Sequence, residues 1–200
     1  ISDDMSQTAK SFKYKEEKII QFIVKNTHLF NPLIYKDKSG RFNFINISPV
    51  DLEDSELKFI NYLTEYITNF TPEGIIYILR NPSRKGIGFF ETMGFYPDFI
   101  LWKIVDNRHT IAFIEPHGMV HEKFADNEKF KWIDWLPQLK DSIKANSTIS
   151  NIDFDLHVFF LSVTKYDDLN WSISKNDLKG KNIHFLEDGV DAIKEIFDKL

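Results

Sequence analysis

The chain has 200 residues, of which 42% are hydrophobic and 28% charged, and its formal net charge is −5. This composition supports one sizeable core and excludes an intrinsically disordered chain. The chain contains no cysteine, which excludes disulfides, cysteine zinc ligands and a cysteine nucleophile, and fits a reducing cytoplasm. No apolar run approaches the roughly 20 residues of a membrane span. The acidic balance means that any contact with nucleic acid must use a local basic patch.

The first 46 residues predict an extension that precedes the main domain. Apolar residues recur at helical spacing between Phe12 and Thr27, which predicts a helix that ends before Pro32. Alternating residues within 33–47 predict a β-hairpin. The sequence begins with Ile1 rather than Met, so we expect that the chain was processed or cut from something longer, in which residues 1–46 would be a linker or extension.

Residues 47–200 predict a single α/β domain, in which a central mixed sheet is flanked by helices. The expected elements in chain order are a helix over 51–70 with Asp51 as N-cap, strands over 74–79, 98–104 and 110–115, a helix over 127–146 kinked or split by Pro137, strands near 156–163 and 181–186, and a closing helix with Val190, Ile193, Phe197 and Leu200 on one face.

Acidic residues mark the ends of two neighbouring predicted strands. Asp98 opens the first strand, Glu115 and His117 close the second, and a short polar turn over 106–109 joins them. A hairpin that sets Asp98 opposite His117 brings all three side chains onto one face at one end, because side chains alternate along a strand. Cross-strand neighbours lie about 5 Å apart and diagonal ones about 7–8 Å apart, so the two carboxylates can share one cation. A slip of one residue would turn Asp98 to the wrong face. In the simpler alternative, both acids end strands at the surface.

A third carboxylate is expected from the helix over 51–70. Its apolar stripe of Ile60, Leu63 and Ile67, extended toward the N-terminus, reaches Glu56 and then Glu53. Charged groups rarely face a core without a partner, although Glu56 is solvated if the first turn protrudes beyond the core. Three converging carboxylates favour Mg²⁺ or Mn²⁺, an ion that can polarise a phosphoryl oxygen and activate water.

A longer set of segments resembles a known family. Those segments are Ile47–Phe59, Tyr77–Phe90, Gly94–Trp102 and Ile111–Gly118. They resemble the C-terminal region of DEAD/DEAH-type helicases related to type III restriction Res subunits, and they contain the PD-(D/E)XK nuclease pattern. The resemblance covers residues 47–200 and implies a restriction-endonuclease-like fold. It also implies Mg²⁺-dependent endonuclease cleavage of DNA, in restriction or phage defence.

The resemblance also assigns residues and partners. Asp98 and Glu115 are implied as metal ligands and catalytic residues, with Glu56 assisting directly or through water. The chain has no G-x-x-x-x-G-K-S/T loop, so the implied helicase motor lies elsewhere in the parent chain or in a partner subunit.

One position departs from the family pattern. His117 stands where the family has lysine. A histidine can donate to a phosphoryl oxygen or act as a general base near neutral pH, but it does not supply a permanent charge. Lys123, Lys129 or Lys131 could take over the role. Otherwise the site is weakened, and the fold serves as a DNA-binding module or docks the helicase or a partner. The sequence does not separate DNA from RNA as the target. A zinc site made by His117 and His121 is a minor alternative.

Basic and aromatic residues flank this region. Arg80, Arg84 and Lys85 lie in a predicted loop before the site, where they contact phosphates or are simply solvated. Trp132 and Trp135 on the next predicted helix are expected in the core rather than as base-stacking groups.

Overall fold

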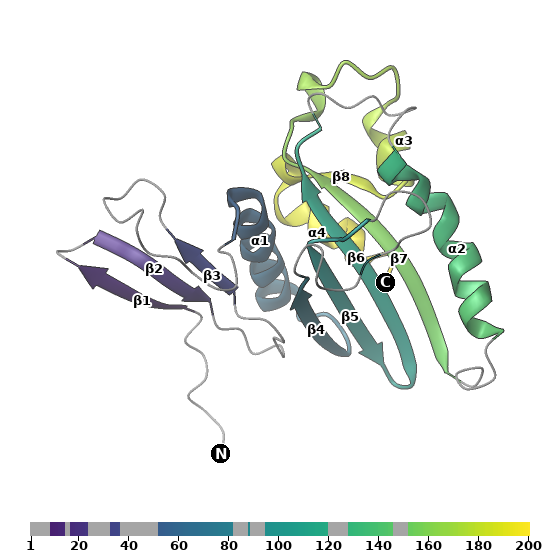
Figure 1. The fold of residues 1–200 in the computed structure, drawn as a ribbon, viewed down its shortest axis with the longest axis horizontal. Helices are drawn as coiled ribbons and strands as arrows, with labels where there is room; N and C mark the ends of the chain where they lie inside the picture. Colours follow the sequence, from purple (N-terminus) through teal and green to yellow (C-terminus); the bar gives the residue numbers. More distant parts are fainter. Residues whose placement is uncertain are drawn as a thin grey trace.

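The structure is a computed structural model (Figure 1). It describes residues 52–81, 88, 95–119, 128–145 and 152–200 and, as backbone strands, residues 9–14, 17–23 and 33–36. None of the described helices combines the length and the apolar composition that a bilayer crossing requires.

The N-terminal region forms a three-stranded antiparallel sheet. Its strands are β1 (Ala9–Tyr14), β2 (Glu17–Ile23) and β3 (Leu33–Lys36), paired in that order. The helix predicted between Phe12 and Thr27 is therefore wrong. The apolar residues also fit a period of two, and Phe12 is the register partner of Ile20 across the hairpin. Of the hairpin predicted within 33–47, residues 37–47 lie outside the described residues.

The remaining elements follow the predicted order, with one short helix added. They are α1 (Asp54–Phe70), β4 (Ile75–Arg80), β5 (Phe99–Val105), β6 (Arg108–His117), α2 (Lys131–Lys144) after a 3-10 turn (Glu128–Phe130), β7 (Asp153–Ser162), a 3-10 turn (Tyr166–Asp168), α3 (Lys175–Gly180), β8 (Ile183–Phe185), a 3-10 turn (Leu186–Asp188) and α4 (Val190–Phe197). The helix α3, between β7 and β8, is the element that the sequence reading missed.

The central sheet has five strands in the order β4-β5-β6-β7-β8. The pairs β4/β5 and β5/β6 are antiparallel, whereas β6/β7 and β7/β8 are parallel. The prediction of an α/β arrangement with a central mixed sheet is confirmed. The parallel pairs need crossover connections, and these carry α2 and α3.

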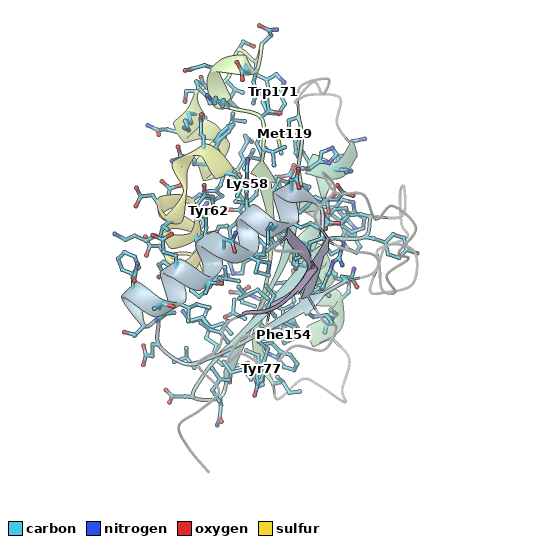
Figure 2. All side chains as sticks on the ribbon, turned by 90° about the vertical axis from the view of Figure 1, so that its left-hand side faces the viewer. Lys58, Tyr62, Tyr77, Met119, Phe154 and Trp171 are labelled. Carbon is cyan, nitrogen blue, oxygen red and sulfur yellow. The ribbon has the colours of Figure 1, made fainter. Side chains whose placement is uncertain are left out.

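Helices cover both faces of this sheet. α1 and α4 pack on one face, where they share a buried cluster with Phe99, Leu101, Ile114 and Phe159. α2 packs against β7 on the opposite face, over a second cluster that includes Trp132, Leu136, Val158 and Phe160. In Figure 2, α1 crosses in front of the sheet. Met119 and Trp171 lie toward one end of the molecule, and Tyr77 and Phe154 lie toward the other.

Two details of the helices differ from expectation. α1 begins at Asp54 with Glu53 as its N-cap, so Asp51 is not the cap. Pro137 lies inside α2, which runs on without a break from Lys131 to Lys144. The exposed position of Pro137 leaves its ring on the solvent side of the helix.

Candidate active site

The hairpin of β5 and β6 sets Asp98 directly opposite Glu115. The ladder pairs Phe99 with Ile114 and Val105 with Arg108, and its next position beyond Phe99 is Asp98 with Glu115. The predicted register, with Asp98 opposite His117, is wrong by two residues. Because side chains alternate with period two, this even shift keeps the three side chains on one face.

The turn explains the difference in register. Asp106 and Asn107 alone form it, and Asp106 adopts a positive φ of 51°. Aspartate and asparagine tolerate this left-handed conformation, so a two-residue turn is available at this sequence. The polar residues Arg108 and His109, which were expected in the turn, extend the ladder instead.

Hydrogen bonds hold the backbone at Asp98. Its N–H donates to Oε2 of Glu115 at 3.2 Å, and its carbonyl accepts from the N–H of Asn81 at 2.7 Å. The buried side-chain amide of Asn81 donates to the carbonyl of Pro97 at 2.8 Å. The ends of β4, β5 and β6 are thereby joined at the site, at the Met119 end of the molecule seen in Figure 2.

Negative charge accumulates around Asp98. Burial raises the pKa of Asp98 from its ordinary value of 3.8 to about 8, and the charges of Glu115 and Glu56 add to the rise. The positive charges of Lys129 and Arg80 lower the same pKa in part. Burial and the neighbouring carboxylates together therefore outweigh the effect of the local cations on this pKa. A divalent cation between Asp98 and Glu115 would relieve this repulsion, and carboxylate oxygens are the donors that Mg²⁺ and Mn²⁺ prefer. These two residues fit such an ion.

A lysine from a different element reaches Glu115. Lys129, in the 3-10 turn before α2, places Nζ 3.0 Å from Oε1 of Glu115, whose side chain is only 8% exposed. Of the three downstream lysines considered, Lys131 is exposed and Lys123 lies outside the described residues. His117 ends β6, half-buried, two residues beyond Glu115 and thus on the same face.

Glu56 is buried, as its place in the helical stripe predicted, and Glu53 is exposed. Protein donors already occupy both carboxylate oxygens of Glu56. Oε2 accepts from the N–H of Glu53 at 2.6 Å and from Nη2 of Arg80 at 3.0 Å, and Oε1 accepts from Nε of Arg80 at 3.3 Å. Across the described ranges, no three acidic or histidine side chains form a group that could hold a metal ion. The metal site of three carboxylates, with Glu56 as its third member, stays a prediction.

The structure describes only some of the basic and aromatic residues that flank the site in the sequence. Arg80 is the last residue of β4 rather than a loop residue, and its side chain is 12% exposed. Arg84 and Lys85, like His121, lie outside the described residues. Trp132 is buried and Trp135 packs against the same core cluster, which confirms both as core residues.

Sequence reasoning missed two contacts, the pairing of Arg80 with Glu56 and the Asn81 amide bond to Pro97. In the sequence, the position of Asn81 directly after an apolar strand was the one indication that its side chain could be buried and hydrogen-bonded. Compared with known proteins, the chain matches no family model, no curated protein and no solved structure.

Proposed function

We propose that residues 47–200 are a PD-(D/E)XK nuclease domain with the restriction-endonuclease-like fold. It hydrolyses phosphodiester bonds of DNA with Mg²⁺ or Mn²⁺, as part of a larger helicase-nuclease in restriction or phage defence. The sequence segments that resemble this family support the proposal. The mixed sheet with two antiparallel and two parallel pairs is compatible with it.

The observation that carries the proposal is the alignment of Asp98 with Glu115 at the end of one hairpin, with Lys129 on Glu115. Asp98 and Glu115 would hold the ion, which supplies polarisation of a phosphoryl oxygen and activation of water. Lys129 supplies the permanent positive charge that the family expects from the lysine position. His117, on the same face, accepts a proton or donates to a phosphoryl oxygen.

A second candidate function is a nuclease fold that has lost catalysis and binds DNA or docks a partner. The ion pairs made by Lys129 and Arg80 favour it, because they balance much of the charge on Glu115 and Glu56 without a metal. The net charge of −5 also favours docking over autonomous DNA binding.

Cleavage of supercoiled plasmid with Mg²⁺ or Mn²⁺ tests the proposal. The wild type should be compared with Asp98→Ala and, as a control of the same type, Asp167→Ala at an exposed site. The parent helicase belongs in the assay if it can be purified. Cleavage that is lost only in Asp98→Ala supports the nuclease. An inactive wild type that still binds DNA supports the second function. A parallel assay with RNA decides between the two nucleic acids.

A further inference from the structure

Glu56 is committed to Arg80 by two hydrogen bonds. The guanidinium meets both carboxylate oxygens, at 3.0 Å and 3.3 Å, and the two side chains are 12% and 8% exposed. Planar two-point pairing of this kind is stronger and more directional than a single lysine contact. The N–H of Glu53 adds a third donor at 2.6 Å, since Glu56 is the third residue of α1. The carboxylate is therefore fixed in position and paired with a positive charge.

The same pair fixes Arg80 beside the site. Arg80 ends β4 opposite Phe99, on the face of the sheet that α1 covers, and Asp98 directly precedes Phe99 at the same strand end, where the charge of Arg80 lowers its pKa. The next residue, Asn81, is bonded to the backbone of Asp98 at 2.7 Å. Arg80 is thus a permanent positive charge held at the edge of the carboxylate pair, supported by α1 through Glu56.

We infer that Glu56 is not a metal ligand in this chain but the positioning residue of Arg80, and that Arg80 binds a backbone phosphate of the nucleic acid next to the Asp98–Glu115 pair. This inference rests on the proposed function. It changes the expected ligand set from three carboxylates to two, and it gives the site a second fixed cation besides Lys129.

The cost of breaking the pair supports this assignment. A metal ion that used Glu56 would have to compete with the guanidinium of Arg80, which meets both carboxylate oxygens, and displacing Arg80 would break a buried ion pair. Removing one partner of a buried ion pair is strongly destabilising, because the charge that remains is not compensated. A phosphate anion that approaches Arg80 meets no such cost, because the ion pair with Glu56 is kept. Fixed donors of this kind need no rearrangement when charge develops during hydrolysis.

The test measures Mn²⁺ binding by isothermal titration calorimetry on the whole 200-residue chain. It compares the wild type with Glu56→Gln, Arg80→Gln, the double variant Glu56→Gln/Arg80→Gln, Asp98→Asn and the exposed first-turn control Asp54→Asn. The double variant removes one charge of each sign, so it leaves no buried unpaired charge and keeps the net charge of the site. Thermal melts of every variant report on folding.

The double variant should bind Mn²⁺ within about threefold of the wild type, because its net charge is unchanged. Arg80→Gln should bind Mn²⁺ more tightly than the wild type, since a nearby positive charge is gone. Asp98→Asn should lose more affinity than the about tenfold to hundredfold typical of an outer partner of a metal site. Loss of Mn²⁺ binding in a folded double variant, to the level of Asp98→Asn, would overturn the inference and restore Glu56 as a ligand.

A second readout concerns phosphate binding. Binding of a short fluorescein-labelled DNA duplex in Ca²⁺ should weaken in Arg80→Gln and in the double variant, and less in Glu56→Gln. Unchanged DNA affinity in both Arg80 variants overturns the phosphate assignment. A wild type that binds no Mn²⁺, or an Asp98→Asn variant that binds it equally well, refutes the proposed function itself. These outcomes differ from those that refute only the role of Glu56.

Discussion

Lys129 places its ammonium nitrogen 3.0 Å from Oε1 of Glu115, from a turn that lies after β6 in the chain. This pairing puts a permanent positive charge at the end of the hairpin where His117 supplies none. The contact depends on the course of the chain after β6, because α2 returns to pack against β7 beside the site.

If Lys129 stabilises the developing negative charge, as the family lysine is expected to do, Lys129→Ala should slow DNA cleavage about 10²–10³-fold. This is the usual loss when one group that stabilises a developing anion is removed. Lys131→Ala, which removes an exposed lysine two residues away, should leave the rate within about twofold. Single-turnover cleavage of plasmid in Mg²⁺ measures both. Equal rates for the two variants would remove Lys129 from the catalytic assignment.

The role of His117 is tested by His117→Lys. This substitution places a permanent charge at the family position, two residues from Glu115 on the same face of β6. In an active enzyme that uses Lys129, cleavage should change little at any pH tested, because Lys129 already supplies the permanent charge. A large gain of cleavage would instead show that the natural site is impaired, and would favour the DNA-binding or docking function. The measurement is the cleavage rate from pH 6 to pH 9.

The burial of Asp98, together with the charges of Glu115 and Glu56, makes the metal-free site a source of instability. The folded protein holds a proton on Asp98 up to about pH 8, whereas the ordinary pKa is 3.8. The folded state therefore binds more protons than the unfolded state between these values, and the free energy of unfolding falls as the pH rises through that window. Asp98→Asn should raise the melting temperature at pH 8 by roughly 2–5 °C in the presence of a chelator.

The control for this variant is Asp167→Asn, at an exposed aspartate. The gain from Asp98→Asn should be small at pH 4, where the carboxyl group is protonated in the folded state. Added Mn²⁺ should stabilise the wild type at pH 8 and not Asp98→Asn. A destabilised Asp98→Asn at pH 8 would mean that the carboxylate is better compensated than its surroundings indicate.

Local patterns were sufficient to predict most elements of the central domain. Apolar runs with clear boundaries gave the order of strands and the helices α1, α2 and α4, and the period of two put Asp98 and Glu115 on one face. The register was missed because it depends on whether Asp106 adopts a left-handed conformation, which the sequence permits but does not require. The β1–β2 hairpin was missed because its apolar residues fit both periods.

Contacts between elements far apart in the chain were beyond the sequence reading. The partner of Glu56 is Arg80, 24 residues away, and a helical stripe indicates that a glutamate is buried without indicating what it meets. The choice of Lys129 among three lysines depended on where the chain turns before α2. Periodicity reports which face a residue occupies, whereas ion pairs depend on how elements pack together.

Asn81 should matter for both stability and metal binding. Its buried amide donates to the carbonyl of Pro97, and Asn81→Ala would leave that carbonyl without this donor, at a cost of about 1–3 kcal/mol. The backbone at Asp98 should become less well fixed, so Mn²⁺ affinity should also fall. Asn61→Ala, at an exposed position of α1, is the control and should leave both unchanged. Chemical denaturation and calorimetry report the two effects. Normal Mn²⁺ binding in a destabilised Asn81→Ala would limit Asn81 to a structural role.

His184 should make the domain sensitive to mild acid. The ring is 1% exposed, its Nδ1 lies 3.0 Å from Oε2 of Glu195, and its buried Nε2 has no hydrogen-bond partner among the described residues. Burial lowers the pKa of His184 below 6.5, and the nearby Lys199 and Lys179 act in the same direction, although Glu195 opposes them. The unfolded state then binds more protons than the folded state in this range. Stability is present above pH 6.5 and is lost as the pH falls toward the lowered value.

A substitution separates this effect from other titrations. His184→Leu removes the titrating ring, and Glu195 keeps its ion pair with Lys179 at 2.8 Å. The variant should lose less stability than the wild type between pH 7 and pH 5, measured by urea denaturation at each pH. The half-buried His157, whose pKa is also lowered by burial, provides the comparison through His157→Leu. Its more exposed ring should contribute a smaller part of the acid sensitivity, because water reaches the protonated form. If His157→Leu flattens the pH dependence and His184→Leu does not, the acid-sensitive group lies at Asp155 and His157 on β7 rather than between β8 and α4.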